Sequence, residues 1–235
     1  MKYILSFLFV LLYFFISLCS LIALILFPSR KIRTLYRSLD SKEEDERIQA
    51  IRPFVLPGDT ILDIGSGSGR FGKAVQDTLQ TQVTGVDVCN YADPVIPFFV
   101  YNGKKLSFPD KSFDIVFLAF VLHHITNQDD ILNEAIRVSR KKIVIFEDTF
   151  DWFWERLFVC WNDYHTNIFQ GWIKSWKGYL KGNPAEMPMP LTFRSCKDWK
   201  KNFNRFPVKL ISEEIRKMGY KPLKKVTFCL ELKNE

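Results

Sequence analysis

A short glycine-rich stretch, Thr60-Ile-Leu-Asp-Ile-Gly-Ser-Gly-Ser-Gly-Arg-Phe-Gly72, constrains the fold of this chain more than any other feature. Ile61–Ile64 is rich in apolar, β-branched residues and is bounded by Pro57-Gly58 and by glycines, which is typical of a fully buried parallel strand. From Arg70 onward, apolar residues recur at helical spacing. A strand, a glycine loop and a helix N-terminus in this order predict a binding site for a nucleotide-type ligand.

Two ligands fit this unit. The segment Gly67-Ser-Gly69-Arg-Phe-Gly72 has the G-x-G-x-x-G spacing of dinucleotide-binding folds, although that match alone is weak. The string Asp63-Ile-Gly65-Ser-Gly67-Ser-Gly69 instead resembles the first motif of the class I S-adenosylmethionine-dependent methyltransferases. An acid at the strand tip suits the ammonium group of that cofactor and would repel a pyrophosphate.

The next two segments decide between these ligands. Gln82–Asp87 reads as a second strand with Asp87 at its carboxyl end, the edge where open α/β sheets bind ligands. A carboxylate there can accept ribose hydroxyls in either cofactor. Leu106–Ile125 contains a Phe-Pro-Asp turn, a Phe-Asp pair, a buried strand and Val-Leu-His-His. This block resembles the fourth-strand region of small-molecule methyltransferases, so the resemblance covers Thr60 to about Phe150.

The resemblance implies an α/β fold, a Rossmann-like, doubly wound, seven-stranded sheet with the last strand antiparallel, and S-adenosylmethionine as the cofactor. Asn102 stands where the family often has Asp, and its carbonyl oxygen can still accept from the adenine amino group. Ala119 is expected to offer a backbone contact after the fourth strand. The implied cofactor-binding residues are Asp63, Gly65, Ser66, Gly67, Gly69, Asp87, Asn102 and Ala119.

Periodicity and capping residues predict further elements. Ser139-Arg-Lys-Lys142 replaces the turn usual in the family and is expected to be a surface loop. Residues 208–216 should supply one of the last two strands, although they also suit a helix start. We predict helices at about 41–52, 69–79 and 128–138, strands at 60–64, 82–87, 115–118, 143–146 and 224–233, and a last helix starting in Thr192–Phe203.

The N-terminal segment Tyr3–Phe27 carries no charge and is dense in Leu, Ile and Phe. It exceeds the apolar region of a signal peptide, lacks a cleavage pattern, and is long enough for a membrane span. Four basic residues within 30–37 follow it, which favours a cytoplasmic C-terminal part. We therefore predict a transmembrane anchor at 1–28, a basic linker at 29–40, a methyltransferase domain at 41–235 and a single-pass protein bound to a lipid bilayer.

Composition limits which partners and which kind of cysteine chemistry the chain can be expected to have. The formal net charge is +7, but no zinc-finger spacing, RNP-like string or long basic arm is present, so nucleic acid is not an expected partner. The five cysteines are scattered without a C-x-x-C pair, which indicates reduced thiols rather than a disulfide framework. The sequence indicates no particular oligomeric state.

An aromatic insertion is predicted at about 150–204, where tryptophans alternate with lysines before a proline-rich loop. Aromatic and basic residues together favour the headgroup zone of a membrane, which would make this segment an interfacial lid. The alternative is an insertion helix packed on the domain, with its aromatics as ordinary core.

Methyl transfer from a sulfonium is an in-line displacement that depends mainly on positioning, and a base is needed only where the acceptor must lose a proton. Candidate acid/base groups are Asp148, His124 and His165, although Glu147 and Asp148 also fit cap or turn acids.

The three histidines have no metal-ligand spacing, so no metal is predicted. We expect a membrane-anchored methyltransferase acting on a lipophilic or small-molecule acceptor; the alternative is a non-catalytic cofactor-binding or scaffold protein.

Overall fold

The computed structural model of the protein describes residues 42–90, 94–175, 190–217 and 223–233, with the backbone alone for residues 165–175. Six earlier residues are also described, namely Leu8, Leu11, Leu12, Phe15, Leu18 and Cys19. The remaining parts of the predicted anchor and linker, and residues 176–189 of the predicted insertion, lie outside the described residues.

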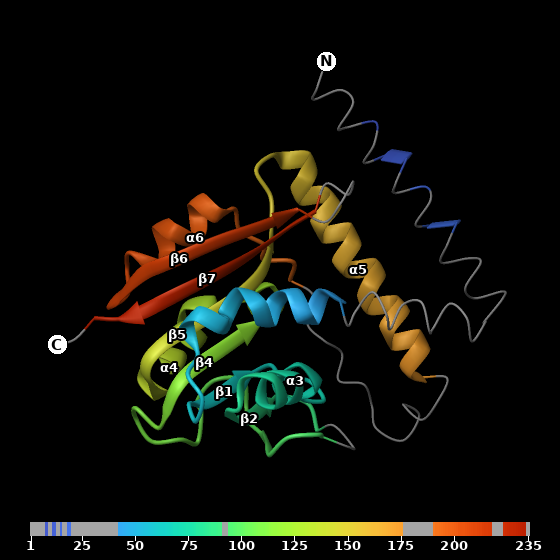
Figure 1. Cartoon of the computed structure of the whole chain (residues 1–235). Coiled ribbons are helices and arrows are strands. Elements are labelled where there is room, and N and C mark those ends of the chain that lie inside the picture. Colours follow the sequence, from blue (N-terminus) through green and yellow to red (C-terminus); the bar gives the residue numbers. More distant parts are fainter. Residues whose placement is uncertain are drawn as a thin grey trace.

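A seven-stranded sheet with the order β3-β2-β1-β4-β5-β7-β6 forms the centre of the fold (Figure 1). Neighbouring strands from β3 to β5 are parallel, whereas β7 runs antiparallel to both β5 and β6. This confirms the predicted seven-stranded sheet with an antiparallel last strand. The strands are β1 (Thr60–Ile64), β2 (Gln82–Asp87), β3 (Phe98–Val100), β4 (Phe113–Ala119), β5 (Ser139–Thr149), β6 (Val208–Lys217) and β7 (Lys224–Leu232).

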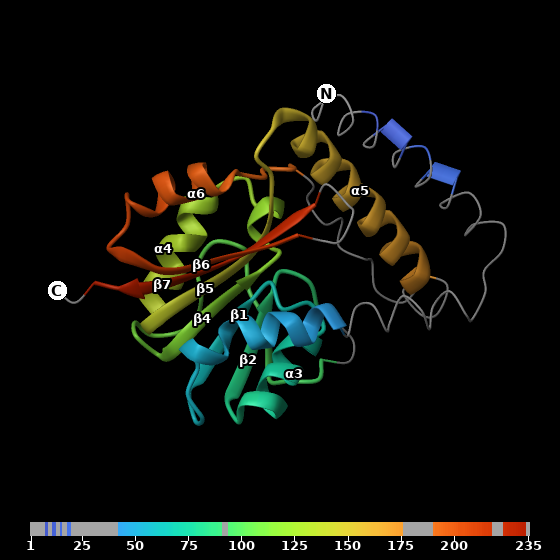
Figure 2. The same ribbon diagram turned by 45° about the horizontal axis from the view of Figure 1, so that its top comes forward.

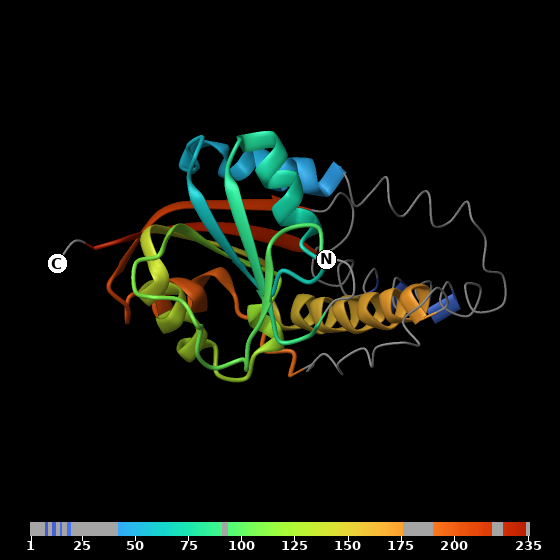
Figure 3. The ribbon, with the colours of Figure 1, turned by 90° about the horizontal axis from the view of Figure 1, so that it is seen from below.

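Helices cover both faces of the sheet, and each face has its own apolar core (Figure 3). Residues 42–51 are helical and pack with α3 (Arg70–Leu79) against one face, together with side chains such as Ile61 and Phe117. The opposite face buries Leu62 and Leu118 under α4 (Gln128–Val138) and α6 (Cys196–Phe203). Because side chains alternate along a strand, successive residues of one strand serve different cores.

One long helix, α5 (Phe153–Ser175), follows β5 and extends away from the sheet (Figure 2). Its first turns are anchored by Phe158 and Val159, which are buried with Phe193 and Leu223 in a third, small cluster. Two short 3₁₀ helices complete the described elements, η1 (Arg52–Phe54) and η2 (Leu122–His124).

Most predicted boundaries agree with the structure, and the differences lie where pairing extends a strand. The predicted surface loop at 139–142 is wrong: β5 begins at Ser139, because Ser139 pairs with Phe113 of β4 and Lys142 pairs with Glu231 of β7. The ambiguous segment at 208–216 is the strand β6. The short edge strand β3 was not predicted, since three residues carry no periodic signal.

The predicted single-pass membrane localisation is corrected. Within the part of the chain that the structure describes, no helix is long and apolar enough to cross a membrane. The prediction rested on the length and apolarity of the uncharged run Tyr3–Phe27, on its lack of a cleavage pattern and on the basic residues that follow it.

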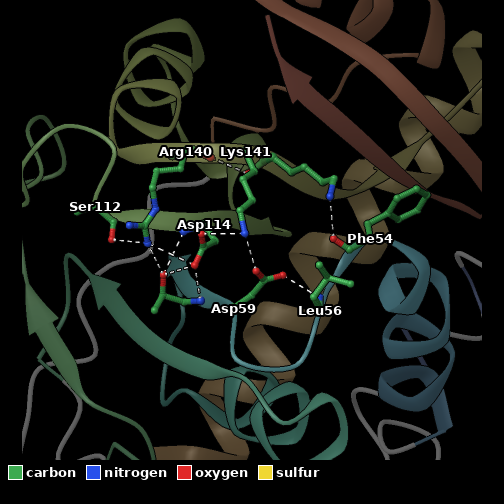
Figure 4. A network of polar contacts seen from close by, with 10 residues as sticks. Phe54, Leu56, Asp59, Ser112, Asp114, Arg140 and Lys141 are labelled. Carbon is green, nitrogen blue, oxygen red and sulfur yellow. Dashed lines mark hydrogen bonds and ion pairs between the residues drawn. The ribbon is translucent and has the colours of Figure 1, made fainter. Parts of the chain in front are cut away.

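Hydrogen bonds and ion pairs link the first residues of β1, β4 and β5 at the amino ends of these strands, on the side of the sheet opposite the glycine loop (Figure 4). The Asp114 Oδ2 atom accepts hydrogen bonds from the Thr60 backbone N–H and hydroxyl at 3.0 and 2.8 Å. Lys141 Nζ lies 3.0 Å from both Asp114 Oδ1 and Asp59 Oδ1. Burial would raise the pKa of Asp114, but the Thr60 hydrogen bonds and Lys141 lower it to about 2.

We expect Asp114→Asn to destabilise the fold at pH 7 by about 1–3 kcal/mol, because it weakens hydrogen bonds to a charged acceptor. A carboxyl whose pKa is lowered in the folded state stabilises above its unfolded pKa and loses that contribution as the pH falls towards 2. The difference between variant and wild type should therefore shrink between pH 5 and about pH 3 in urea unfolding. Asp110→Asn, at an exposed acid paired with Arg137, should change stability by less than about 0.5 kcal/mol.

Candidate functional site

The glycine loop follows β1 and brings its backbone close to neighbouring elements. Gly65, Gly67 and Gly69 all have φ values between 56° and 79°, the left-handed region that favours glycine. A Cβ atom built on Gly65 would lie 2.4 Å from a methyl group of Val121, so a side chain there meets the segment after β4. The loop thus requires glycine for both backbone conformation and space.

Asp63 lies beneath this loop, in β1, and is only 2% exposed. Its Oδ1 atom has no hydrogen-bond partner among the described residues. Burial, and then the negative charge of Asp87, raise the pKa of Asp63 to about 7, although Arg47 opposes the shift. A buried carboxyl without a partner is costly to ionise, so a ligand with a positive group, such as the ammonium of S-adenosylmethionine, would satisfy it.

Asp87 is held against the glycine loop at the end of β2. Its Oδ2 atom accepts a hydrogen bond from the Gly67 N–H at 2.9 Å, and its Oδ1 atom accepts from the Cys89 N–H at 3.1 Å. Each carboxylate oxygen offers about two acceptor positions, so about two remain for hydroxyl groups. Tyr101, which sequence reasoning missed, lies nearby, and burial followed by the charge of Asp87 raises its pKa to about 12.

Ala119 and Asn102, the two other predicted cofactor-binding residues, differ in whether the structure places them at the cofactor-binding edge. Ala119 ends β4, opposite Phe146 of β5, at the same carboxyl edge as Asp63 and Asp87. Asn102 is exposed, and its Oδ1 atom accepts from the N–H groups of Lys104 and Lys105 at 3.0 Å each. That oxygen therefore holds a local turn, and the contact with adenine stays a prediction.

Ser66 and Arg47 add polar groups near the loop. The Ser66 Oγ atom is buried without a hydrogen-bond partner among the described residues, and it lies 2.4 Å from the position that a Cβ atom on Gly85 would take. Arg47 belongs to the helix at 42–51, and its guanidinium carbon lies 4.6 Å from the centre of the Phe71 ring. Its positive charge acts on Asp63 and opposes the rise of that residue's pKa.

The segment after β4 is fixed by residues far away in the sequence. The Thr192 hydroxyl lies 3.0 Å from the Ile125 carbonyl oxygen, and the Thr192 N–H donates to the His123 carbonyl oxygen at 3.2 Å. Gln128 Nε2 donates to the carbonyl oxygens of Leu122 and Thr192. Together these contacts hold η2 and its two histidines in place.

His123, rather than the predicted His124, is the more deeply buried of the two, with 2% exposure. Its Nδ1 atom lies 2.6 Å from Glu147 Oε2, while Glu147 Oε1 accepts from the Leu122 N–H at 2.9 Å. Burial alone would lower the pKa of His123, but the Glu147 and Asp163 carboxylates raise it to about 10.

Asp163 of α5 completes this cluster. It lies one helical turn after the buried Val159, which directs both residues towards the domain. The Asp163 Oδ1 atom is 3.5 Å from His123 Nε2 and 4.0 Å from His124 Nε2. Sequence reasoning missed Asp163 because it is some 40 residues from the histidines and has no motif around it.

Asp148 and His165, the other predicted acid/base candidates, are not part of this cluster as far as the structure describes it. Asp148 follows Glu147 in β5 and therefore faces the other side of the sheet, where Lys225 of β7 is its register partner. Burial first raises the pKa of Asp148 to about 6, while Lys225 and His123 oppose the shift. The backbone of His165 lies in α5, and its side chain lies outside the described residues.

Comparisons with known proteins bear on this site. Residues 62–146 match the family model described as a methyltransferase domain. The chain is 32% identical over 129 residues to the ubiquinone/menaquinone biosynthesis C-methyltransferase UbiE of Burkholderia mallei (strain SAVP1). That match covers 48% of this chain and 52% of the relative, so the chain spans about half the length of the curated relatives it matches.

Solved structures share the fold at low identity. The [4+2]-cyclase SpnF has a TM-score of 0.57 at 12% identity, covering 81% of both chains. A 1,6-didemethyltoxoflavin-N1-methyltransferase of Burkholderia thailandensis, with 1,6-didemethyltoxoflavin and S-adenosylhomocysteine bound, has a TM-score of 0.56 at 11% identity, covering 86% of this chain and 85% of the other. Residues 62–146 thus match a methyltransferase domain, the solved structures share the fold of the chain, and both findings agree with S-adenosylmethionine as the cofactor.

Proposed function

We propose that this chain transfers a methyl group from S-adenosylmethionine to a small, largely apolar acceptor. The observation that carries the proposal is the buried Asp63 carboxyl, which has no hydrogen-bond partner for its Oδ1 atom among the described residues and lies beneath a loop of left-handed glycines. This arrangement destabilises the empty site in the way that a binding site for a cation requires.

Each residue of the site is proposed to hold a different part of the cofactor. Asp63 binds the positive end of the cofactor, the Asp87 carboxylate accepts hydroxyl hydrogens, and Gly65, Gly67 and Gly69 let the backbone approach closely. S-adenosylmethionine, when bound, supplies a methyl group already activated by the sulfonium leaving group. The chain's contribution is then to hold the reacting groups in line, which can provide most of the acceleration. We retain Asp148, His124 and His165 as candidate acid/base groups.

An apolar acceptor is favoured by two observations. The curated relative is named for ubiquinone and menaquinone biosynthesis. In addition, the segment that follows β5 exposes large apolar and aromatic side chains beside the site's edge, which is common where apolar ligands enter. These side chains are Trp152, Phe153, Leu157 and Tyr164.

Thermal unfolding of the 235-residue chain tests the cofactor directly. A ligand that binds only the native state raises the melting temperature, and at 100 times its Kd it adds about 2.7 kcal/mol. We expect S-adenosylmethionine and S-adenosylhomocysteine to stabilise the chain and NAD to leave it unchanged. Asp87→Ala should abolish the response, whereas Asp77→Ala, at an exposed acid on α3, should preserve it. Stabilisation by NAD alone would contradict the proposal.

A non-catalytic cofactor-binding or scaffold role is the competing function, because a fold does not fix its function: one structure of the same fold is named a [4+2]-cyclase, so the fold alone does not imply methyl transfer. Incubation with methyl-labelled S-adenosylmethionine and a mixture of quinone precursors and other small apolar acceptors separates the two. Label transfer that is lost in Asp87→Ala supports methyl transfer. Tight cofactor binding without transfer to any acceptor would favour the scaffold.

A further inference from the structure

We propose that His123, His124 and Asp163 form a binding site for a divalent transition-metal ion of the Zn²⁺ type. One ligand atom from each of these residues lies within 4.8 Å of the other two. Tetrahedral zinc with bonds of about 2.0 Å holds its ligand atoms about 3.3 Å apart. The His123 Nε2 and Asp163 Oδ1 atoms are already 3.5 Å apart, so side-chain movements on the order of an ångström would complete the set.

The imidazole of His123 is oriented as a metal ligand requires. Its Nδ1 atom contacts Glu147 at 2.6 Å, and Glu147 is itself fixed by the Leu122 N–H. Phe193 stacks on the ring with its centre 4.4 Å away. With Nδ1–H donated to a carboxylate, the lone pair of a neutral imidazole lies on Nε2, and this support is typical of metal-binding histidines.

The Nε2 atom of His123 is the second observation that points to a ligand. The residue is 2% exposed, and Nε2 makes no hydrogen bond among the described residues; the Asp163 carboxylate lies 3.5 Å away, in a long ion pair. Buried polar atoms are almost always satisfied, so an atom of this kind beside two further ligand side chains marks a position for an ion.

The charge of the cluster selects a cation. The Glu147 and Asp163 carboxylates flank the buried ring of His123, and the next acid along β5, Asp148, faces the other side of the sheet. The two carboxylates favour positive charge on the His123 ring, and a divalent ion bound at Nε2 would take the place of the proton there, whereas an anion would be repelled.

The donor set selects the class of ion. Two imidazoles and one carboxylate suit Zn²⁺, Co²⁺, Ni²⁺ or Fe²⁺, whereas Mg²⁺ and Ca²⁺ prefer oxygen ligands. Three protein ligands leave at least one position for water or for an oxygen atom of a small molecule, as in catalytic rather than structural zinc sites. The site begins only four residues after Ala119 at the carboxyl edge of the sheet, and it does not depend on the proposed methyl transfer.

Calorimetric titration of the chelator-treated 235-residue chain with Zn²⁺ tests the site. We expect 1:1 binding with a Kd of roughly 10 µM or below. His124→Ala and Asp163→Asn should each weaken binding by at least about 100-fold, since each removes a direct ligand. Glu147→Gln should weaken it by about 10- to 100-fold through the orientation of His123. Because His123 is buried and its replacement can unfold the chain, these three variants carry the test, each checked by its melting curve.

Titration with Co²⁺ identifies the ligands. Nitrogen and oxygen ligands should give visible d–d bands without a thiolate-to-cobalt charge-transfer band, and those bands should be absent in His124→Ala. Asp151→Asn, which alters an exposed acid paired with Lys224 at the start of the same segment, should bind metal like the wild type. No 1:1 binding, unchanged affinity in folded His124→Ala and Asp163→Asn, or a thiolate band would overturn the proposal.

Discussion

Replacing Asp63 by Asn is expected to stabilise the chain at pH 8 while it abolishes the response to S-adenosylmethionine. The pKa of Asp63 is raised to about 7 by burial first and then by Asp87. A raised carboxyl pKa means that the folded state holds the proton more tightly, so this group lowers stability as the pH rises from about 4 to 7, and the full cost is present above pH 7. Removing the charge should restore about 1–3 kcal/mol at pH 8 and nothing below about pH 4.

The same carboxylate should dominate cofactor affinity. Losing one partner of a buried charge pair typically costs 2–5 kcal/mol, so Asp63→Asn is expected to weaken cofactor binding by about 100-fold or more. Wild-type affinity should rise between pH 5.5 and 8, because Asp63 must release its proton to pair with the ammonium group.

Urea unfolding across this pH range and calorimetric cofactor titration measure the two effects. Asp77→Asn is the matched control, since that acid is exposed on α3 beside Lys73, and it should change neither quantity. A folded Asp63→Asn variant that is less stable than wild type at pH 8, or that binds the cofactor with unchanged affinity, would refute this role for Asp63.

The part of the fold that sequence predicted well is the part governed by local signals. The strand Thr60–Ile64, the strand Gln82–Asp87 and the helix Gln128–Val138 have their predicted boundaries, because each is a clear apolar pattern bounded by glycine, polar or charged residues. The start of β5 at Ser139 could not be predicted in this way. Residues 140–142 are basic, and this segment becomes strand only through pairing with β4 and β7.

In the site, too, residues within a local motif could be predicted from sequence, whereas residues placed by tertiary packing could not. Asp63, Asp87 and the glycines were identified because a strand end followed by a glycine loop is a local motif, and the structure brings them together at one edge. Asp163 could not be identified, because its position depends on how α5 packs after β5. The spacing of the histidines could not point to the proposed metal site either, since its third candidate ligand is a carboxylate on another element.

The acids Glu147 and Asp148 show that sequence can place residues at an edge of the sheet without telling which face each side chain occupies. Both lie near the carboxyl end of β5, at the ligand-binding edge of the sheet. Their side chains serve opposite faces, so Glu147 contacts His123 while Asp148 lies opposite Lys225. Sequence identified the edge, but the choice of the group near the histidines required the strand's orientation.

Replacing Trp199 by Ala is expected to cost about 3–5 kcal/mol, a large share of the 5–15 kcal/mol by which domains are stable. Trp199 is 1% exposed in α6 and stacks on Phe203, whose ring in turn meets Phe228 of β7 at 5.2 Å. The guanidinium carbon of Arg194 lies 5.0 Å from the centre of the Trp199 ring. A cavity at this position would therefore loosen α6 from the sheet as well as remove apolar contacts.

Trp199→Phe is the matched control and separates volume from hydrogen bonding. The Trp199 Nε1 atom has no hydrogen-bond partner among the described residues, so Phe gives up no such bond and should cost less than about 1.5 kcal/mol. Urea midpoints for the two variants, at unchanged slope, provide the comparison. Similar losses in both would mean that the indole N–H binds a group, such as water, that stabilises the fold, and that packing volume is not what Trp199 contributes. A small loss in Phe with a large loss in Ala would establish that α6 is held to the sheet by the bulk of this ring.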